Sequence, residues 1–308
     1  MNDNTAPTVD LGSALMLLVL AALWGATFFF AEVALNEVPP LTITLHRVVW
    51  ALPVLLLVVL LKGIPIPRSP RVWFYYLVMG ALNNALPFSL IFWGQTEITS
   101  GLASILNGTT AVFGAVVAGI LLADEPLTVR KIVGAILGVI GVAVIIGFDA
   151  LTQLDPKSLA QIAVLGAALS YSLASVWGKK TLAGHPAEMN ALGMLTGSAV
   201  LMFPIAIWSD GLPVLSLSIN VWVSLISVAV FSTALAYLLY FNILARAGSA
   251  NLMLVTLLIP PFAIGLGWAF LEEQIGYEAW FGFGVIAIGL LITDGRVLKM
   301  VKIRKQTS

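Results

Sequence analysis

The chain has 308 residues, of which 60% are hydrophobic and 10% charged, and its mean hydropathy is +1.02. An average soluble domain is about 45–50% apolar and about 25% charged, so the composition indicates an integral membrane protein. Fifteen Lys and Arg balance fifteen Asp and Glu, which excludes the basic surplus of a nucleic-acid-binding protein. The chain has no Cys and two His, which excludes disulfides, Cys-ligated zinc and a thiol nucleophile. We expect neither a metal nor another cofactor.

Apolar windows of membrane-spanning length follow one another along the whole chain. A spanning helix needs about 20 mostly apolar residues, and no alternation typical of barrel strands is present. No positively charged leader precedes the first window, so we expect it to be kept as a span. The sequence predicts an all-α protein with ten transmembrane helices at approximately 12–32, 40–61, 72–95, 98–122, 128–147, 158–180, 188–208, 219–243, 249–271 and 276–294.

The basic residues predict the orientation. With the N-terminus inside, Lys157 is the one loop cation left outside, and Arg47 lies within the second span. Cytoplasmic loops carry an excess of Lys and Arg, so we expect a multi-pass protein of the cytoplasmic (inner) membrane with both termini inside. The cations on the inner side are Lys62, Arg68, Arg71, Arg130, Lys131, Lys179, Lys180, Arg246, Arg296, Lys299, Lys302, Arg304 and Lys305.

The second half of the chain repeats landmarks of the first. Sliding the chain along itself aligns Pro40 with Pro186 and Asp124-Glu125 with Glu272-Glu273. Residues 1–150 then form one repeat with spans one to five, and 151–308 a second with spans six to ten and a basic cytoplasmic tail. Because five is odd, the second repeat enters the membrane in the opposite direction. Inverted repeats of this kind surround a central cavity near the bilayer midplane.

Short motifs at the ends of each half resemble a known family. The stretch Leu23-Trp24-Gly25-Ala26-Thr27-Phe28-Phe29, with Pro39-Pro40 and Arg47 after it, resembles the start of an EamA-type unit of the drug/metabolite transporter superfamily, and Asp124-Glu125-Pro126 with Gly134 resembles its end. The second half repeats the ending but has Ser170 where Trp24 stands and Gly193 where Arg47 stands. The resemblance covers nearly the whole chain and implies a transporter. Its overall pattern is most similar to the amino-acid exporters, including those for aromatic amino acids.

Polar groups within the third span are candidate substrate contacts. Asn83 and Asn84 lie near its centre, and Pro87 leaves the carbonyl of Asn83 without its usual N–H donor. Phe88 lies one turn beyond Asn84. Buried polar groups in a membrane face a partner or a wet cavity, although amides also join neighbouring helices.

Aromatic and polar side chains share helix faces in three other spans. Aromatic rings with one polar atom suit a cavity that stacks an apolar group and orients a polar one, whereas rings at span ends often form interfacial belts. The residues are Trp24, Thr27 and Phe28 in the first span, Tyr171 and Ser175 in the sixth, and Thr233, Tyr237 and Tyr240 in the eighth.

Three further features complete the prediction. The fourth span has a stripe of small residues typical of close packing, with Asn107 as a site candidate within it. Pro260 and Pro261 in the ninth span should form a hinge, together with Pro87 in the third. Spans five and ten are expected at the periphery, so that the protein is a monomer or a homodimer through them.

His46 and Arg47 lie inside the second span. Either one is a candidate for a substrate carboxylate, and His46 is included in the predicted site. For Arg47 we favour a structural tie to Glu32 or extension of its side chain to the head groups, because a buried charge needs a partner or water.

Together these features predict a transporter that exports small organic metabolites, amino acids foremost, by alternating access and without ATP. The alternatives are an exporter of drugs or other metabolites with the same fold, and an intramembrane enzyme. No carboxylate lies deep in any span, and Glu32 and His46 are the nearest ionisable groups. We therefore expect no obligatory proton exchange.

Overall fold

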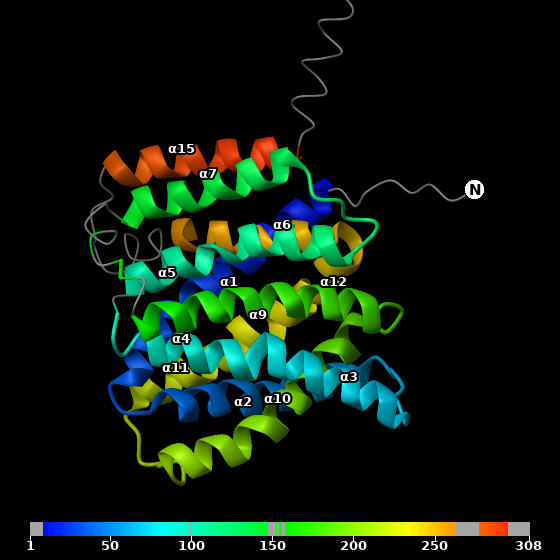
Figure 1. Cartoon of the computed structure of the whole chain (residues 1–308). Helices are drawn as coiled ribbons and strands as arrows, with labels where there is room; N and C mark the ends of the chain where they lie inside the picture. Colours follow the sequence, from blue (N-terminus) through cyan, green and yellow to red (C-terminus); the bar gives the residue numbers. More distant parts are fainter. Residues whose placement is uncertain are drawn as a thin grey trace, which may run out of the picture.

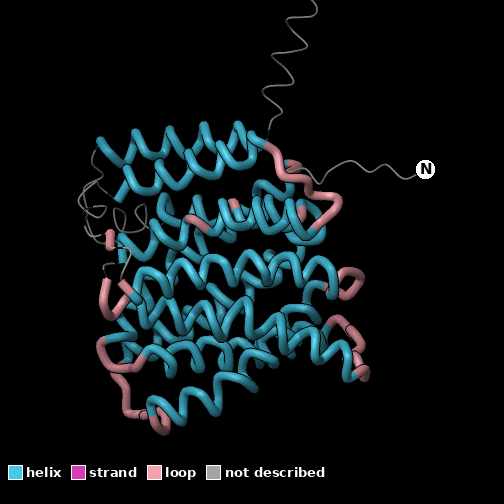
Figure 2. The backbone as a smooth tube through the Cα atoms, in the orientation of Figure 1, coloured by secondary structure: helices cyan, strands magenta, loops and turns pink. Residues whose placement is uncertain are grey.

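The structure is a computed structural model that describes residues 9–98, 100–146, 152, 154–155, 158–262 and 277–294. In these residues it contains helices, turns and loops and no strand (Figure 2). The helices are α1 Leu11–Leu35, α2 Pro40–Leu61, α3 Pro70–Gly80, α4 Leu86–Gly94, α5 Ser100–Gly108, α6 Thr110–Leu121, α7 Val129–Ile146, α9 Leu159–Thr181, α10 Ala187–Asp210, α11 Ile219–Ala229, α12 Ala236–Ala247, α13 Ser249–Met253 and α15 Tyr277–Asp294.

Six helices are long and apolar enough to cross a membrane. Helices α3 and α4 form one continuous span, Pro70–Gly94, and α11 and α12 form another, Ile219–Ala247; the other four are α1, α2, α9 and α10. Shorter apolar helices cover Ile105–Leu121, Ser249–Phe262 and Trp280–Thr293. The protein is therefore a helical multi-pass membrane protein. The count of ten spans and their inverted relation remain predictions.

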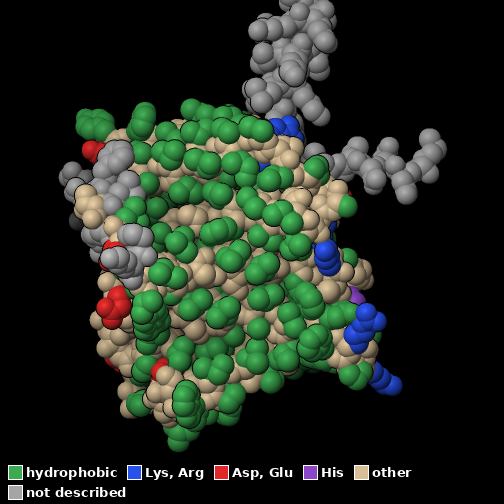
Figure 3. Space-filling view, in the orientation of Figure 1, with side chains coloured by type: hydrophobic (Ala, Val, Ile, Leu, Met, Phe, Trp, Pro, Cys, Tyr) green, Lys and Arg blue, Asp and Glu red, His purple; other side chains and the backbone are tan. Residues whose placement is uncertain are grey.

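The outer surface carries large apolar side chains in a broad band (Figure 3). Leu57, Leu60, Val200, Phe203 and Ile288 are all more than half exposed. A soluble monomer rarely exposes apolar patches of more than a few hundred Å², whereas a bilayer solvates such a band. In the same view, Lys and Arg gather at one end of the helices and Asp and Glu at the other.

Helices α7 and α15 pack against each other at one edge of the bundle (Figure 1). A Cβ on Gly134 would lie 2.5 Å from the carbonyl oxygen of Gly289, and a Cβ on Gly141 would lie 2.9 Å from that of Gly282. Small residues thus let the two backbones approach closely. Because these glycine faces contact each other within one chain, a homodimer through spans five and ten would have to use their outer faces.

Two spans contain a π-helical turn near their centre. Turn η1 (Ala81–Ala85) joins α3 to α4, and η2 (Val230–Leu235) joins α11 to α12. In η1 the N–H of Leu86 donates to the carbonyl of Ala81, five residues back. Such wide turns free backbone carbonyls and are frequent at functional sites.

Candidate substrate-binding site

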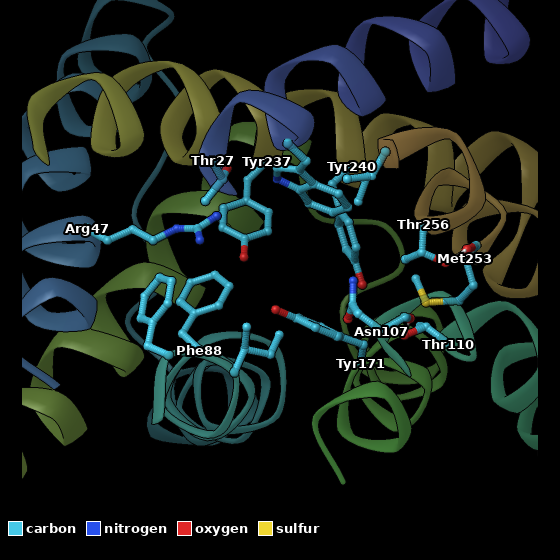
Figure 4. Close-up of a pocket in the computed structure, with 14 residues that line it drawn as sticks. Thr27, Arg47, Phe88, Asn107, Thr110, Tyr171, Tyr237, Tyr240, Met253 and Thr256 are labelled. Atoms are coloured by element: carbon cyan, nitrogen blue, oxygen red, sulfur yellow. Dashed lines mark hydrogen bonds between the residues drawn. The ribbon is translucent and has the colours of Figure 1, made fainter. Parts of the chain in front are cut away.

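A buried cavity lies between the helices, and α1, α2, α4, α9 and α12 each contribute to its wall (Figure 4). Its volume is about 60 Å³, which holds only a few water molecules. Ligand pockets usually measure about 300–1,000 Å³, so a metabolite would have to widen it. The lining residues are Trp24, Thr27, Arg47, Phe88, Ile91, Phe92, Asn107, Thr110, Tyr171, Tyr237, Tyr240, Met253, Thr256 and Ile259.

Aromatic rings form much of the wall. The ring centroids of Trp24 and Tyr237 are 6.2 Å apart, those of Tyr237 and Tyr240 are 5.7 Å apart, and Phe88 lies 6.4 Å from Tyr171. Tilted and edge-on pairs at these distances are favourable. The cavity can therefore stack an apolar or aromatic group.

Backbone and side-chain hydrogen bonds hold the rings in place. The Tyr237 hydroxyl donates to Asn84 Oδ1, and Asn84 Nδ2 donates to Ser198 Oγ at 2.7 Å. The indole N–H of Trp24 donates to the carbonyl oxygen of Ser232, in η2, at 3.1 Å. Asn84 thus positions Tyr237 from behind and does not line the cavity itself.

Arg47 is the charged residue among the described residues that line the cavity. Its side chain is 5% exposed, Nε donates to Thr233 Oγ1 at 2.9 Å, and Nη2 donates to the carbonyl oxygen of Ser232 at 3.2 Å. Its Cζ lies 3.8 Å from the centre of the Phe88 ring, a cation–π distance. Extension toward the head groups is therefore wrong, because the guanidinium points inward. The side chain of Glu32, its other expected partner, lies outside the described part of the chain.

Three polar atoms of the lining have no hydrogen-bond partner among the residues that the structure describes. They are Thr27 Oγ1, Asn107 Oδ1 and the Tyr240 hydroxyl, and all three side chains are buried. An unpaired buried polar group costs about 1–3 kcal/mol. These atoms are therefore available to a polar ligand or to water.

The structure brings six of the predicted site residues to the cavity: Trp24, Phe88, Asn107, Tyr171, Tyr237 and Tyr240. Asn83 and Asn84 lie one layer behind it. The side chain of Phe28 lies outside the described residues. Pro87 is buried in the first turn of α4. Pro260 and Pro261 are helical, and the predicted span beyond Phe262 is outside the described range, so their hinge role remains a prediction.

His46 and Ser175 do not line the cavity. His46 Nδ1 accepts from Trp50 Nε1 at 2.9 Å, and its ring packs against Trp222 with centroids 5.7 Å apart. Ser175 Oγ lies 2.5 Å from Ser249 Oγ. Each of these side chains is directed to a neighbouring helix and not into the cavity, and their part in substrate binding stays a prediction.

Several lining residues escaped the sequence prediction. Thr110 follows Asn107 by one turn and could have been found by helical spacing. Met253 and Thr256 carry no comparable signal, because both residue types are ordinary in apolar helices. Of the residues that the structure describes, no group of three or more His, Cys, Asp or Glu could hold a metal ion.

A bundle of membrane-crossing helices around a buried, partly polar cavity is the architecture of a membrane transporter. The chain belongs to the EamA-like transporter family, in the drug/metabolite transporter superfamily, and the family model matches residues 11–147 and 158–293.

Individual relatives agree with this assignment. The chain is 29% identical over 288 residues to the transporter YvbV of Bacillus subtilis, covering 92% of this chain and 91% of that protein. It is 26% identical over 279 residues to the protein PecM of Dickeya dadantii, covering 88% of each. A solved crystal structure with 18% sequence identity has the same fold, with a TM-score of 0.75 over 92% of this chain and 97% of that one.

Proposed function

We propose that this transporter exports small organic metabolites, amino acids foremost and aromatic and neutral ones among them, across the cytoplasmic membrane. It works by alternating access, with the cavity opening in turn to either side, and without ATP. The basic end of the helices faces the cytoplasm in this proposal, as the distribution of Lys and Arg favours.

The composition of the cavity is the observation that carries the proposal. Aromatic rings suit an apolar side chain, and the unpartnered oxygens of Thr27, Asn107 and Tyr240 suit a polar head that donates hydrogen bonds. An amino acid combines both. The position of Trp24 and Tyr171 near the middle of α1 and α9 favours a site near the bilayer midplane, where carriers with inverted repeats bind their substrates.

The alternative is an exporter of drugs or other metabolites with the same fold. The aromatic wall would also accept apolar drugs. An intramembrane enzyme fits the cavity less well, because the described residues that line it include no Ser–His or Asp–Asp pair.

Counterflow into liposomes tests the proposal. The purified chain is reconstituted with one unlabelled amino acid inside, and uptake of the same labelled amino acid is measured across a panel that includes phenylalanine, tryptophan, leucine and threonine. We expect saturable uptake of at least one neutral or aromatic member, abolished by Trp24→Ala. Uptake of lipophilic dyes with no amino acid carried would favour the alternative. Absence of any counterflow would contradict the proposal.

A further inference from the structure

The guanidinium of Arg47 is only partly used by the protein itself. Its hydrogen bonds to the described residues leave from Nε and Nη2; none of them leaves from Nη1, and no carboxylate of these residues pairs with it. A guanidinium has five N–H donors. A buried charge without a counter-ion is costly, so it normally meets a partner or solvent.

Its surroundings orient this charge toward the cavity. Thr233 and the carbonyl of Ser232, both in η2, hold one edge of the guanidinium, and the face of Phe88 covers its plane. Figure 4 shows the guanidinium directed into the space beside Tyr237. A planar fork fixed in this way matches a carboxylate, which accepts two parallel N–H bonds.

We infer that Arg47 binds a carboxylate of the transported solute and thereby restricts the site to carboxylate-bearing compounds. That the bound solute is transported rests on the proposed function, but its binding can be measured without transport. The unpartnered atoms Asn107 Oδ1 and the Tyr240 hydroxyl then receive a hydrogen-bond donor of the same solute. Together with the rings between them, these groups select a molecule with an anionic end, an apolar part and a polar group.

A matched pair of probes tests the inference in the purified full chain. Phenylacetate and phenylacetamide share the aromatic ring and differ in the carboxylate. We expect phenylacetate to raise the thermal unfolding midpoint of the wild type and phenylacetamide to raise it less. In Arg47→Gln the apparent Kd for phenylacetate should rise at least about tenfold, the loss expected for a charge-assisted hydrogen bond.

Two variants serve as controls. Arg47→Lys keeps the charge without the fork, so its Kd should lie between those of wild type and Arg47→Gln, and Arg246→Gln removes an exposed arginine and should have no effect. Equal binding of both probes by wild type, or an unchanged preference in a folded Arg47→Gln protein, would overturn the inference. Failure of counterflow with binding intact would instead overturn the proposed function.

A separate set of contacts closes one side of the cavity. Glu125 follows α6, and its side chain is buried, with 2% exposed. Its Oε1 accepts hydrogen bonds from Lys179 Nζ at 2.5 Å and from the N–H of Ser249 at 2.7 Å. Its Oε2 accepts a hydrogen bond from the N–H of Ala250 at 2.8 Å. Lys179 also contacts Asp124 Oδ2 at 2.6 Å. One buried carboxylate thus joins the end of α6 to the last turn of α9 and the first turn of α13.

The same three helices run from this carboxylate to the cavity. Thr110 in α6, Tyr171 in α9 and Met253 in α13 line the cavity. The next layer contains the bond between Ser175 and Ser249. An apolar layer lies beside it and consists of Ala118, Leu122, Val176 and Ala250.

Helices α6 and α13 are closely packed between the cavity and Glu125. A Cβ on Gly114 would lie 2.7 Å from Cγ of Met253, so α6 and α13 touch directly below the cavity. No alanine would fit there without a shift of the methionine. Side chains of α6, α9 and α13 are therefore packed directly against one another between the cavity lining and the Glu125 carboxylate.

We propose that Glu125, Lys179 and the start of α13 form a latch, and that this latch must open for the cavity to exchange solute with the basic end. The proposal rests on the transport function proposed above. Charge-assisted bonds to a buried carboxylate are strong and directional, so they favour the closed arrangement. When the helices part, water can solvate both charges.

Cysteine accessibility tests the latch, because the natural chain has no Cys. Thr110→Cys places a thiol in the cavity wall, and its alkylation by an impermeant reagent is timed from each side of the membrane. Glu125→Gln or Lys179→Met should raise the rate from the basic end about tenfold, as expected for loss of a charge-assisted bond. Leu212→Cys, exposed at the opposite end, reports the orientation of the vesicles.

The pair Lys62–Glu188 provides the matched control. It is a 2.5 Å ion pair between the ends of α2 and α10, and Thr42 and Asp210 tie the other ends of the same helices. Because the contact between Thr42 and Asp210 still joins α2 to α10 when the ion pair is lost, Lys62→Gln should leave the alkylation rate of Thr110→Cys unchanged. An unchanged rate in folded Glu125→Gln protein, or an equal rise from both sides, would overturn the latch. Because alkylation requires no substrate, this result is independent of the counterflow assay.

Discussion

The hydroxyl groups of Tyr237 and Tyr240 have different surroundings, although both rings line the cavity. Tyr237 donates to Asn84 Oδ1, whereas the hydroxyl of Tyr240 has no partner within the described part of the chain. We expect Tyr237→Phe to lower the free energy of unfolding by about 1–3 kcal/mol, because a buried acceptor loses its donor. Tyr240→Phe should change it little. Thermal unfolding in detergent measures both, and equal losses would contradict the assignment of partners.

Asp124 gives a prediction about pH. The hydrogen bond from Lys179 lowers the pKa of the Asp124 carboxyl below the ordinary 3.8, and the charge of Lys131 acts in the same direction. Lys179 also donates to the neighbouring Glu125. A depressed folded pKa means that the stabilisation is complete above about pH 4 and is lost as the pH falls through the folded pKa.

The thermal unfolding midpoint is measured from pH 7 down to pH 3. As the pH falls through the acid end of this range, the midpoint should fall less steeply in Asp124→Asn than in wild type. In a Lys179→Met background the same substitution should have a smaller effect, because the hydrogen-bond partner of Asp124 is gone and only the more distant charge of Lys131 remains. Half of the Asp124 side chain is exposed, so we expect a small effect.

At this scale the sequence predicted the rings better than the polar groups. Helical spacing identifies Trp24, Tyr171 and Tyr237 because shared faces follow from the period of the helix. Asn83 and Asn84 lie one layer behind the cavity lining in which they were expected, since they lie within the π turn η1, which rotates the helix face. The direction of Arg47 could not be predicted, because depth in a span does not say which face a side chain takes.

The contact between α7 and α15 supplies a prediction at the scale of elements. A methyl group on Gly289 would lie 2.6 Å from the carbonyl oxygen of Gly134, whereas one on Gly284 in the same helix meets nothing within 4 Å. Gly289→Ala should destabilise the protein by about 1–3 kcal/mol through overpacking. Gly284→Ala should be neutral or stabilising by up to about 1 kcal/mol, since Ala favours helix. Similar unfolding midpoints for both variants would contradict this packing.

The π turns also form a reciprocal pair of contacts. Trp24 donates to the carbonyl of Ser232 in η2, and Ser170 donates to the carbonyl of Leu82 in η1 at 2.6 Å. The sequence alignment of the two halves already placed Ser170 at the position of Trp24. This exchange of contacts is what inverted repeats would produce, and it supports that prediction.

Long elements were predictable and interruptions were not. Helix ends follow Pro and Gly at the turns, so the long windows agree with α1, α2, α9 and α10. The fourth window is divided at Thr109 into α5 and α6, where only Gly108 hinted at a break. Pro87 explains the wide turn η1, but η2 contains no Pro, so its position depends on tertiary contacts that a sequence does not reveal.

The residues that line the cavity bear on the source of energy for transport by the whole molecule. Among the described residues that line it there is no Asp, Glu or His, and His46 is directed to Trp50 and Trp222. A proton-coupled carrier normally has an ionisable group that changes protonation during the cycle. We therefore expect solute to move down its own gradient without obligatory proton exchange.

Liposomes with equal substrate on both sides and an imposed pH gradient test this expectation. No net accumulation should occur. Accumulation that disappears in His46→Ala or Glu32→Gln would show coupling and would identify the proton site.

The small volume of the cavity bears on affinity. Because about 60 Å³ must widen before a metabolite fits, part of the contact energy between solute and wall is used to separate the rings, and this lowers the net affinity. Weak binding shortens the residence time of the solute, since affinity differences appear mainly in dissociation rates. If the protein exports a metabolite as proposed, its site would stay nearly empty at low cytoplasmic concentration, and the rate of transport would rise in proportion as the metabolite accumulates. In the proposed exporter, the tight packing of the aromatic wall would therefore set the solute concentration range over which transport rises.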